Sequence, residues 1–411
     1  MVVSADDTRT GAPVRTRVLP RTLAGATVLQ IVPSLRNTPQ VRTTISAARA
    51  LVQVGARAIV AGERGELVDE LKSFGGEWLP FSSATFNPAK LRSNADALDA
   101  FVAAERVDIV HAKHAGAAWS ALVATDRNSV CLITDLPDLP RTRMWLAAFY
   151  LGALARGDRV ISHSMFNARP MIARHRIPIE RVSVIPRSID LVHFDPSRVQ
   201  PERIAALRQT WGIPSGVRIV LVPGRIAPWN GQLTLVEAAR LLTERGIAGV
   251  TFVLVGDDRR HRRYAAKFWK QAQAQGVDAL FRMVGHHSDM PTAYAASDLI
   301  VVPYVAAPVY GRVVAEAQAM ARPVVTTSVG PLPENILTPP RIADELRTGW
   351  EVAPGNAVEL AAAIETALAL DASDYRALAA RARQFAEYMF SPQRAAAATL
   401  EIYVSLLESQ G

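Results

Sequence analysis

One segment of the chain carries a residue combination that suits a phosphate. In VPGRIAPWNGQ (222–232), a β-branched run ends in Gly224 and Arg225, and a helix opens after Asn230. Glycine lets a ligand approach the backbone, a helix N-terminus presents free N–H groups, and a guanidinium forms paired hydrogen bonds to phosphate. The segment predicts an anion site, with an ordinary strand–loop–helix turn as the plain alternative.

A second segment could hold the sugar and phosphates of a nucleotide. In PVYGRVVAEAQAMARPVVTTSVG (308–330), a glycine opens a helix, and Glu316 follows within its next turns, before a buried strand. A carboxylate there can accept hydrogen bonds from two ribose hydroxyls, while the first amides face a pyrophosphate. The amides concerned belong to Gly311, Arg312, Val313 and Val314. The alternative is a surface glutamate on an ordinary helix.

Both segments lie in a chain whose short apolar runs alternate with amphipathic helices. Runs without polar alternation predict strands buried on both faces, as in a parallel sheet. The expected strands are 27–32, 56–62, 107–112, 129–134, 158–163 and 182–186, then 217–224, 250–257, 280–285, 298–304 and 323–328. The pattern predicts an α/β protein of two Rossmann-like, doubly wound domains, with ligands at the carboxyl ends of the strands.

The rhythm also suggests where the domains divide. Residues 1–26 lack periodicity and are expected to form a flexible basic tail. Prolines interrupt the pattern over 187–216, which we interpret as a linker. The predicted domains are therefore 27–195 and 196–390, followed by a C-terminal helix at 391–411.

Composition narrows the class of protein. The 411 residues are 49% hydrophobic and 20% charged, which excludes a disordered or fibrous chain. The single cysteine, Cys131, excludes an internal disulfide and a cysteine-based metal cluster. No apolar stretch reaches the roughly 18 residues of a membrane span, and the N-terminus lacks an apolar signal core. We therefore expect a cytoplasmic protein.

Charge is distributed unevenly along the chain. Residues 1–200 hold 25 Lys and Arg against 18 Asp and Glu, which is +7 of the total of +8. The run at 141–156 is apolar between terminal arginines, so it could lie on a bilayer or form part of the core. Together these features predict peripheral contact with an anionic inner membrane leaflet. A solvated arginine-rich surface is the alternative, and no motif indicates a nucleic-acid partner.

With the intervening motifs, the chain resembles the family-four glycosyltransferases of the GT-B fold, in the bacterial branch that builds lipopolysaccharide and other envelope glycans. The additional motifs lie at 107–121, 155–166, 181–196, 255–258, 284–304 and 349–356. The resemblance implies sugar transfer from a nucleotide-sugar donor to a glycan or lipid-linked acceptor, with retention and without a metal or other cofactor. It also implies that the last helix crosses back to the first domain.

The resemblance assigns roles to several residues. Arg225 would neutralise the donor diphosphate, and Glu316 would hold the ribose. Gly224, Gly256 and His286 would also belong to the donor site, with His286 near the nucleotide base. Asp135 stands where relatives place a histidine close to the reacting face.

The chain departs from the family pattern at other positions on the cleft side. Thr38 and Pro39 stand in place of a glycine pair, which limits how closely the backbone can approach a ligand. The neutral Asn230 stands at a lysine position, and Pro308 replaces the first glutamate of a Glu-x7-Glu motif. A Gly-Gly loop further on contains Pro331.

These losses leave two functions open. The leading hypothesis is an active glycosyltransferase. The alternative is a catalytically decayed GT-B protein that binds a partner in glycan assembly. A nucleotide-sugar epimerase is less well supported, because its acid–base residues are not evident.

Two further clusters contain residue types that occur in ligand sites. His286, His287 and Asp289 could suggest a metal, but adjacent residues at a strand end point to opposite sides. RRHRR (259–263) could hold phosphate or could be a solvated helix start. We therefore predict no metal site, and we favour a solvated helix start over a phosphate site for the arginine run.

Overall fold

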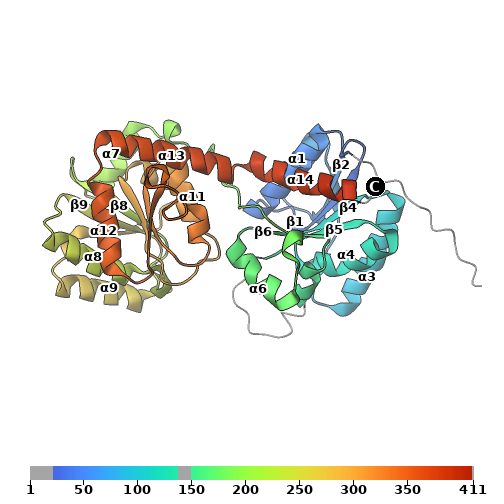
Figure 1. The fold of residues 1–411 in the computed structure, drawn as a ribbon, viewed down its shortest axis with the longest axis horizontal. Coiled ribbons are helices and arrows are strands. Elements are labelled where there is room, and N and C mark those ends of the chain that lie inside the picture. The colour runs from blue at the N-terminus through green and yellow to red at the C-terminus, as the bar shows by residue number, and fades with distance from the viewer. Residues whose placement is uncertain (1–21, 138–149, 410–411) are drawn as a thin grey trace, which may run out of the picture.

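The chain folds into two α/β lobes that lie side by side, each built on one parallel sheet (Figure 1). The computed structural model describes residues 22–137 and 150–409. Each strand in both sheets pairs with its neighbours in parallel, with helices in the crossovers. This arrangement confirms the prediction of two doubly wound domains.

The first lobe has a seven-stranded sheet in the order β3-β2-β1-β4-β5-β6-β7. Its strands are β1 (Thr27–Ser34), β2 (Arg57–Glu63), β3 (Glu77–Pro80), β4 (Ile109–Ala112), β5 (Cys131–Asp135), β6 (Arg159–Ser162) and β7 (Val182–Val184). Its helices are α1 (Pro39–Gln53), α2 (Val68–Ser73), α3 (Pro88–Ala104), α4 (Ala115–Asn128) and α6 (Met165–His175). The sequence pattern does not predict β3, because this edge strand is partly exposed and ends at a proline.

The second lobe has a six-stranded sheet in the order β10-β9-β8-β11-β12-β13. Its strands are β8 (Arg218–Pro223), β9 (Val250–Val255), β10 (Phe281–Gly285), β11 (Leu299–Val302), β12 (Val324–Thr327) and β13 (Gly349–Val352). Its helices are α7 (Pro201–Thr210), α8 (Gln232–Glu244), α9 (Arg262–Ala274), α10 (Met290–Ala295), α11 (Arg312–Ala319), α12 (Ala357–Leu368) and α13 (Ala372–Phe390). Strand β9 is buried along its whole length, as its unbroken apolar run predicts.

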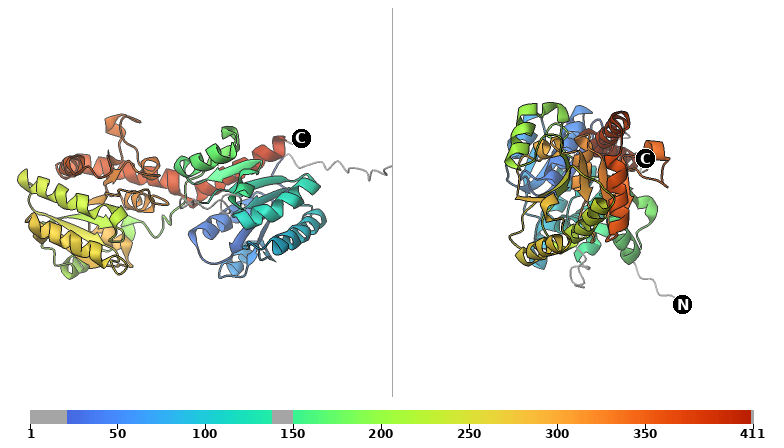
Figure 2. Two further views of the ribbon diagram at one scale, coloured as in Figure 1. Left: turned by 90° about the horizontal axis from the view of Figure 1, so that it is seen from below. Right: turned by 90° about the vertical axis from the view of Figure 1, so that its left-hand side faces the viewer.

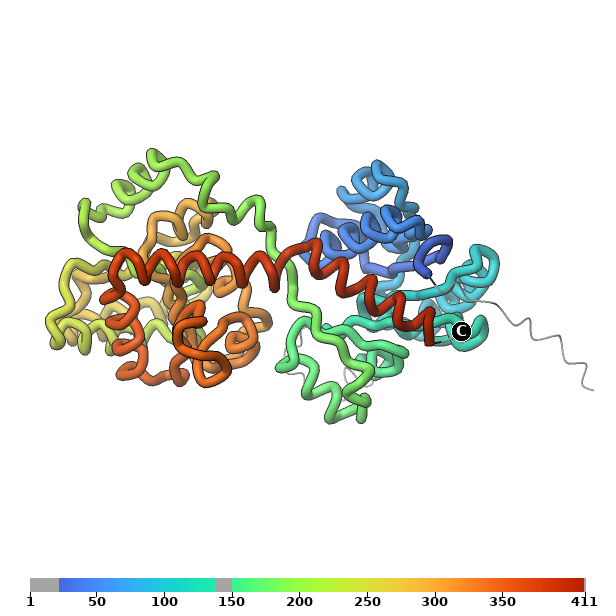
Figure 3. Tube along the Cα trace, turned by 45° about the horizontal axis from the view of Figure 1, so that its top comes forward, coloured from blue at the N-terminus to red at the C-terminus, as the bar shows by residue number. Residues whose placement is uncertain are grey.

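The last helix ties the two lobes together. Ser391 has an extended backbone that ends α13, and Pro392 opens α14 (Pro392–Ser409), which runs onto the first lobe (Figure 1, Figure 2 and Figure 3). Tyr403 and Leu407 of α14 are fully buried in the core of that lobe. Burial of an aliphatic side chain such as Leu407 stabilises the contact by about 1.5–3 kcal/mol. The expected crossing of the last helix is confirmed.

The domain boundaries differ slightly from those predicted. Leu23 and Ala26 are buried in the first core, so the expected tail at 1–26 extends too far along the chain. Ile189 and Phe194 pack into the second core, so the second domain begins before residue 196. In both cases isolated apolar residues outside the regular elements reach a core, which periodicity does not reveal.

The predicted apolar helix at 141–156 lies largely outside the described residues. Its last part forms a 3-10 helix at Gly152–Ala155, packed in the first core through Ala153 and Leu154. Within residues 22–137 and 150–409, no helix has both the length and the apolar character needed to cross a bilayer.

Candidate active site

A cavity of about 490 Å³ opens in the second lobe, where β8 and β9 end. Its lining residues are Arg225, Asp257, Arg259, Arg260 and His261. Neighbouring parallel strands end at the same edge of a sheet, so the loops after β8 and β9 meet there. The three arginines and one aspartate of this lining together carry a formal charge of +2. Such a cavity favours an anionic ligand.

Two residues of the cavity, Asp257 and Arg259, form an ion pair with each other. The Asp257 carboxylate accepts hydrogen bonds from Arg259 Nε at 2.8 and 2.9 Å and from the Arg259 amide at 2.8 Å. The hydrogen bond from the guanidinium is the main reason that the pKa of Asp257 falls to about 2. Asp257 is therefore ionised at neutral pH, and its charge offsets that of Arg259.

Two glycines bring the loops after β8 and β9 into close contact. A Cβ atom at Gly256 would lie 2.0 Å from the carbonyl oxygen of Gly224, which no larger residue could tolerate. Gly224 itself has φ of +136°, a backbone conformation that favours glycine. The predicted Gly224, Arg225 and Gly256 are thus brought together at one corner of the sheet.

Asn230 serves the shape of its own loop. It is buried at the end of a short 3-10 helix, Pro228–Asn230, and its Nδ2 donates to the carbonyl oxygen of Arg225 at 2.6 Å. Gln232 Nε2 donates to the same oxygen at 2.9 Å. The Asn230 amide is therefore engaged within the loop, and position 230 supplies no charge to the cavity.

Glu316 is buried on α11 and is held by two neighbours. Tyr294 Oη donates to its Oε2 at 3.0 Å, and the Arg312 guanidinium pairs with its Oε1. Burial raises the pKa of the carboxyl, while Arg312 opposes that rise. A ribose hydroxyl that donates to Glu316 would have to use the carboxylate lone pairs that Tyr294 and Arg312 leave free.

Fewer backbone amides at the start of α11 are free to bind a phosphate than the sequence predicts. The Val314 amide donates to the Gly311 carbonyl oxygen at 3.0 Å, so it is used inside the helix. This leaves Gly311, Arg312 and Val313 as the residues whose amides open the helix.

Tyr304, which the sequence analysis missed, links the β8 loop to α11. Burial raises the pKa of its phenol to about 12, with the positive charge of Arg225 acting against that rise and the charge of Glu316 adding to it. The Tyr304 hydroxyl would lie only 3.0 Å from a Cβ atom at Gly224. Arg225, Tyr304 and Glu316 are therefore neighbours in one electrostatic environment.

The three residues considered as a metal site do not converge. His286 is exposed beyond β10, whereas the His287 ring packs edge-on against Trp211 at a centroid distance of 6.0 Å. Asp289 caps α10 and pairs with Arg203 at 2.5 Å. Among the residues that the structure describes, no group of three or more potential metal ligands is found.

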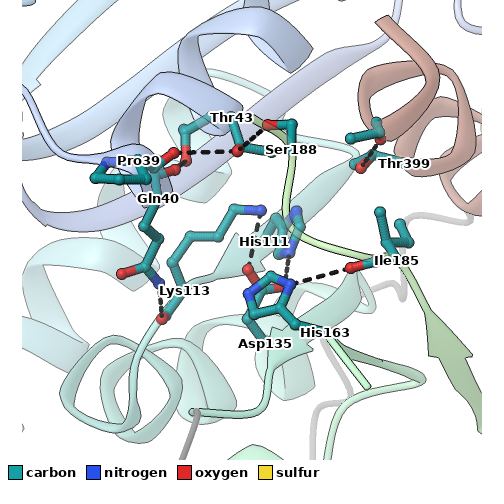
Figure 4. Close-up of polar contacts among 12 residues, drawn as sticks. Pro39, Gln40, Thr43, His111, Lys113, Asp135, His163, Ile185, Ser188 and Thr399 are labelled. Carbon is teal, nitrogen blue, oxygen red and sulfur yellow. Dashed lines mark hydrogen bonds and ion pairs between the residues drawn. The ribbon is translucent and has the colours of Figure 1, made fainter. Parts of the chain in front are cut away.

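A second pocket lies at the strand ends of the first lobe, beside α14 (Figure 4). It is lined by Pro39, Gln40, Thr43, Lys113, Asp135, Ile161, His163, Ile185, Pro186, Arg187, Ser188 and Thr399. Residues from the loops after β1, β4, β5, β6 and β7 meet there, as expected for a ligand site in a doubly wound sheet. The predicted Asp135 thus lies in the first lobe, in a pocket lined by none of the other predicted site residues.

Asp135 is buried within a closed network of polar side chains. Its Oδ1 lies 2.6 Å from His111 Nε2, and its Oδ2 lies 3.1 Å from Lys113 Nζ. His111 Nδ1 in turn lies 2.7 Å from the Tyr403 hydroxyl on α14. Burial lowers the pKa of His111 to about 4, so the ring is neutral; Nε2–H then donates to the carboxylate, and Nδ1 accepts from Tyr403.

The charges of Lys113 and Asp135 depend on each other. Burial lowers the pKa of Lys113, whereas the pKa of Asp135 is held below its usual range because Lys113 and His111 outweigh the effect of burial. An ionised Asp135 can accept a hydrogen bond but has no proton to give. It is therefore suited to orienting a hydroxyl rather than to acid catalysis.

The unusual Thr38-Pro39 pair has a local structural explanation. Thr38 Oγ1 accepts a hydrogen bond from the Val41 amide at 3.4 Å, and Pro39 occupies the first turn of α1. Both residues are strongly favoured at these positions of a helix start. The loop after β1 is thus a capped helix N-terminus, and Pro39 lines the first-lobe pocket.

Contacts between the lobes hold the two strand-end regions toward each other. The carboxylate of Glu334, in the 3-10 helix Leu332–Asn335, accepts hydrogen bonds from the amides of Met165 and Phe166, both at 2.7 Å. These amides open α6, where a negative charge is favourable. Tyr310 Oη also donates to the carbonyl oxygen of Arg187 at 2.7 Å. The segment next to Pro308 is therefore anchored to the first lobe.

Sequence reasoning also missed His111, Lys113 and Tyr403. The position of Lys113 directly after the buried strand β4 could have marked it as a site residue. No sequence pattern could have linked Tyr403 to His111, because the two lie 292 residues apart along the chain.

Two family models match the chain. The model described as Glycosyltransferase Family 4 matches residues 40–193, and the one described as Glycosyl transferases group 1 matches residues 217–369. The first match lies in the lobe with the Asp135 pocket, and the second in the lobe with the arginine cavity.

Curated relatives are similar to this chain over part of its length. A D-inositol 3-phosphate glycosyltransferase of Salinispora arenicola (strain CNS-205) is 28% identical over 68% of this chain and 64% of its own length. A D-inositol 3-phosphate glycosyltransferase of Mycobacterium tuberculosis (strain F11) is 29% identical over 55% of this chain and 48% of its own length. The matches thus span less than two thirds of these relatives.

Solved structures agree over nearly the whole chain. A glycosyltransferase from Rickettsia africae ESF-5 has a TM-score of 0.73 and 27% identity, with 93% of this chain and 99% of that chain covered. Anabaena HepE in complex with UDP has a TM-score of 0.69 and 21% identity, with 93% and 100% covered. With both lobes matched by family models and the fold shared, the chain belongs to the family-four, group 1 glycosyltransferases with the GT-B fold.

Proposed function

We propose that the protein transfers a sugar from a nucleotide-diphosphate sugar to an acceptor hydroxyl. The observation that carries this proposal is the arginine cavity at the ends of β8 and β9, whose formal charge of +2 matches the two negative charges of a sugar nucleotide's diphosphate. The UDP complex of the similarly folded HepE supports UDP-sugars as the first donors to test.

The chemistry proposed is a retaining transfer. The bond between the anomeric carbon and the terminal phosphate oxygen breaks, and the acceptor oxygen bonds to that carbon from the same face. The acceptor proton passes to the leaving phosphate. Arg225 stabilises the charge that develops on the leaving group, so this proposal needs no metal ion. Glu316, through its free lone pairs, would accept hydrogen bonds from the ribose.

The acceptor would bind in the first-lobe pocket, where Asp135 can orient a hydroxyl. An envelope glycan or lipid-linked sugar is the acceptor class suggested by the resemblance. The curated relatives make D-inositol 3-phosphate a second acceptor to test. The net charge of +7 over residues 1–200 supports peripheral binding to an anionic membrane leaflet, which co-sedimentation with anionic liposomes at low and high salt would test.

A decayed, non-catalytic protein is favoured by one observation. Pro308 cannot contact a sugar as a carboxylate would, and Tyr310 nearby is fixed to the first lobe. Restoring both family residues in Pro308→Glu/Asn230→Lys distinguishes the cases. Gained activity would indicate decay, whereas activity lost from a measurable baseline would indicate a changed specificity.

A thermal-shift screen against UDP-, GDP-, ADP- and TDP-sugars tests the proposed donor class. A ligand at 100 times its Kd stabilises the fold by about 2.7 kcal/mol, which is readily detected. Stabilisation by at least one donor, followed by release of its nucleoside diphosphate, is expected. No shift with any of them would overturn the proposed function.

A further inference from the structure

The loop after β9 brings a second uncompensated arginine to the cavity that contains Arg225. Arg259 and Arg260 both line this cavity, but Asp257 pairs with Arg259 at 2.7 Å. Within the described part of the chain, neither Arg225 nor Arg260 has an ion-pair partner. The free positive charge of the cavity therefore belongs to these two side chains.

Backbone contacts hold the loop that carries Arg260 against the loop that carries Arg225. The Ile226 amide donates to the carbonyl oxygen of Asp257 at 3.2 Å, which ties the β8 loop to the β9 loop. The His261 ring packs edge-on against Trp229 at a centroid distance of 4.9 Å, and its amide donates to the Asp258 carbonyl oxygen at 2.7 Å. Residues on both sides of Arg260 are thus anchored.

Position 230 cannot provide the second cation. Asn230 is neutral, and its amide is engaged by the carbonyl oxygen of Arg225. A diphosphate has two ionised phosphates, and a single guanidinium at Arg225 would leave one of them without a counter-charge in the cavity. A charge-assisted contact from the β9 loop would complete the pair.

We propose that Arg260 is the second diphosphate-binding residue of the donor site. Arg225 and Arg260 together contact the two phosphates, and both remain in contact with the nucleoside diphosphate that leaves. This inference rests on the proposed function and deepens it, since it assigns a donor-binding role to a residue of the β9 loop.

The neighbouring α9 provides a matched control. Arg263 is exposed, like Arg260, and belongs to the same basic run, but it does not line the cavity. If the run acts only as a diffuse positive surface, Arg260→Gln and Arg263→Gln will weaken anion binding equally. If Arg260 contacts the diphosphate, only the first substitution will have a large effect.

The experiment is a calorimetric titration of wild type, Arg260→Gln, Arg260→Lys and Arg263→Gln with UDP and, separately, with inorganic pyrophosphate. Arg260→Gln is expected to weaken both ligands about five- to tenfold, and Arg260→Lys less, with Arg263→Gln within twofold of wild type. The melting temperature should not change without ligand, because Arg260 is exposed.

Three results would overturn the inference. These are equal losses for Arg260→Gln and Arg263→Gln, a loss for UDP with none for pyrophosphate, and unchanged binding of both ligands by Arg260→Gln. The proposed function fails separately: in that case wild type itself would show no affinity for any nucleoside diphosphate or nucleotide sugar.

Discussion

Both lobes have polar residues at the carboxyl ends of their strands, but two buried opposite charges pair in the first lobe, whereas positive charge is in excess in the second. In the first lobe, Lys113 and Asp135 are 6% and 5% exposed, and each neutralises the other. In the second lobe, Arg225 and Arg260 are exposed and lack a counter-charge among the described residues. The first pocket is therefore organised before any ligand arrives, whereas the second depends on an anion to complete it.

This difference separates stability from binding. A buried ion pair left with one partner is costly to the fold, whereas an exposed cation can be removed with little effect on folding. Substitutions in the first lobe should therefore act mainly on unfolding, and those in the second on donor affinity.

The largest expected effect comes from breaking the buried pair. Lys113→Met removes the cation that pairs with the buried Asp135 carboxylate, so we expect a loss of about 3–5 kcal/mol in the free energy of unfolding. Urea denaturation measures it. The double variant Lys113→Met/Asp135→Asn should recover part of this loss. A double variant no more stable than the single one would show that the two charges are not coupled.

The second prediction concerns the donor cavity. Arg225→Gln should weaken UDP binding about 30- to 100-fold, equivalent to about 2–2.7 kcal/mol, because a charge-assisted contact to phosphate is lost. Isothermal titration calorimetry measures the affinity, with Gln40→Ala in the first-lobe pocket as the control. Equal weakening by both variants would contradict the division of roles between the lobes.

The third prediction is acid sensitivity of the first lobe. The Ala117 amide donates to His114 Nδ1 at 3.4 Å, and Nε2 lies 2.9 Å from Ser83 Oγ, so the folded ring is neutral. Burial lowers the pKa of His114 to about 4, against about 6.5 in the unfolded chain. The unfolded state therefore takes up a proton first as the pH falls.

Stability should accordingly decline between about pH 6.5 and 4, by about 2 kcal/mol from this residue. His111 contributes in the same direction, because its pKa is lowered likewise. His114→Asn keeps a helix-capping side chain but does not titrate, so it should reduce the slope of stability against pH. An unchanged slope in that variant would exclude His114 as a source.

The smallest effect is expected for the contact between α14 and the first lobe. Tyr403→Phe removes the hydroxyl that His111 Nδ1 accepts from and leaves that nitrogen unsatisfied, which should cost about 1–2 kcal/mol. Chemical denaturation of the variant checks this value. Wild-type stability would mean that the hydroxyl contributes nothing to the docking of α14.

The fold could be predicted because its signals are local. The buried runs at β1, β8 and β9 identify parallel strands, and the glycines at 224 and 256 mark the loops that meet at the strand ends. The position of Arg225 at the cavity follows from the same reasoning.

The partners of the site residues could not be predicted, because they depend on contacts distant in sequence. Asp135 acquires its role from His111 on the neighbouring strand and from Lys113 directly after that strand, and His111 acquires its role from Tyr403 on the last helix. An asparagine at position 230, where the family has lysine, suggested a lost phosphate contact. In the structure, the side-chain amide of Asn230 instead donates to the carbonyl oxygen of Arg225 and holds the loop in shape.

Hydrogen–deuterium exchange with and without saturating UDP tests most directly where the donor binds. We expect protection to be greatest in the loops that follow β8 and β9, residues 224–232 and 256–264, with a smaller change at the start of α11. The helix start at 36–44, in the first-lobe pocket, should change least. Protection centred on 36–44, or none in the β8 and β9 loops under saturating UDP, would contradict this expectation.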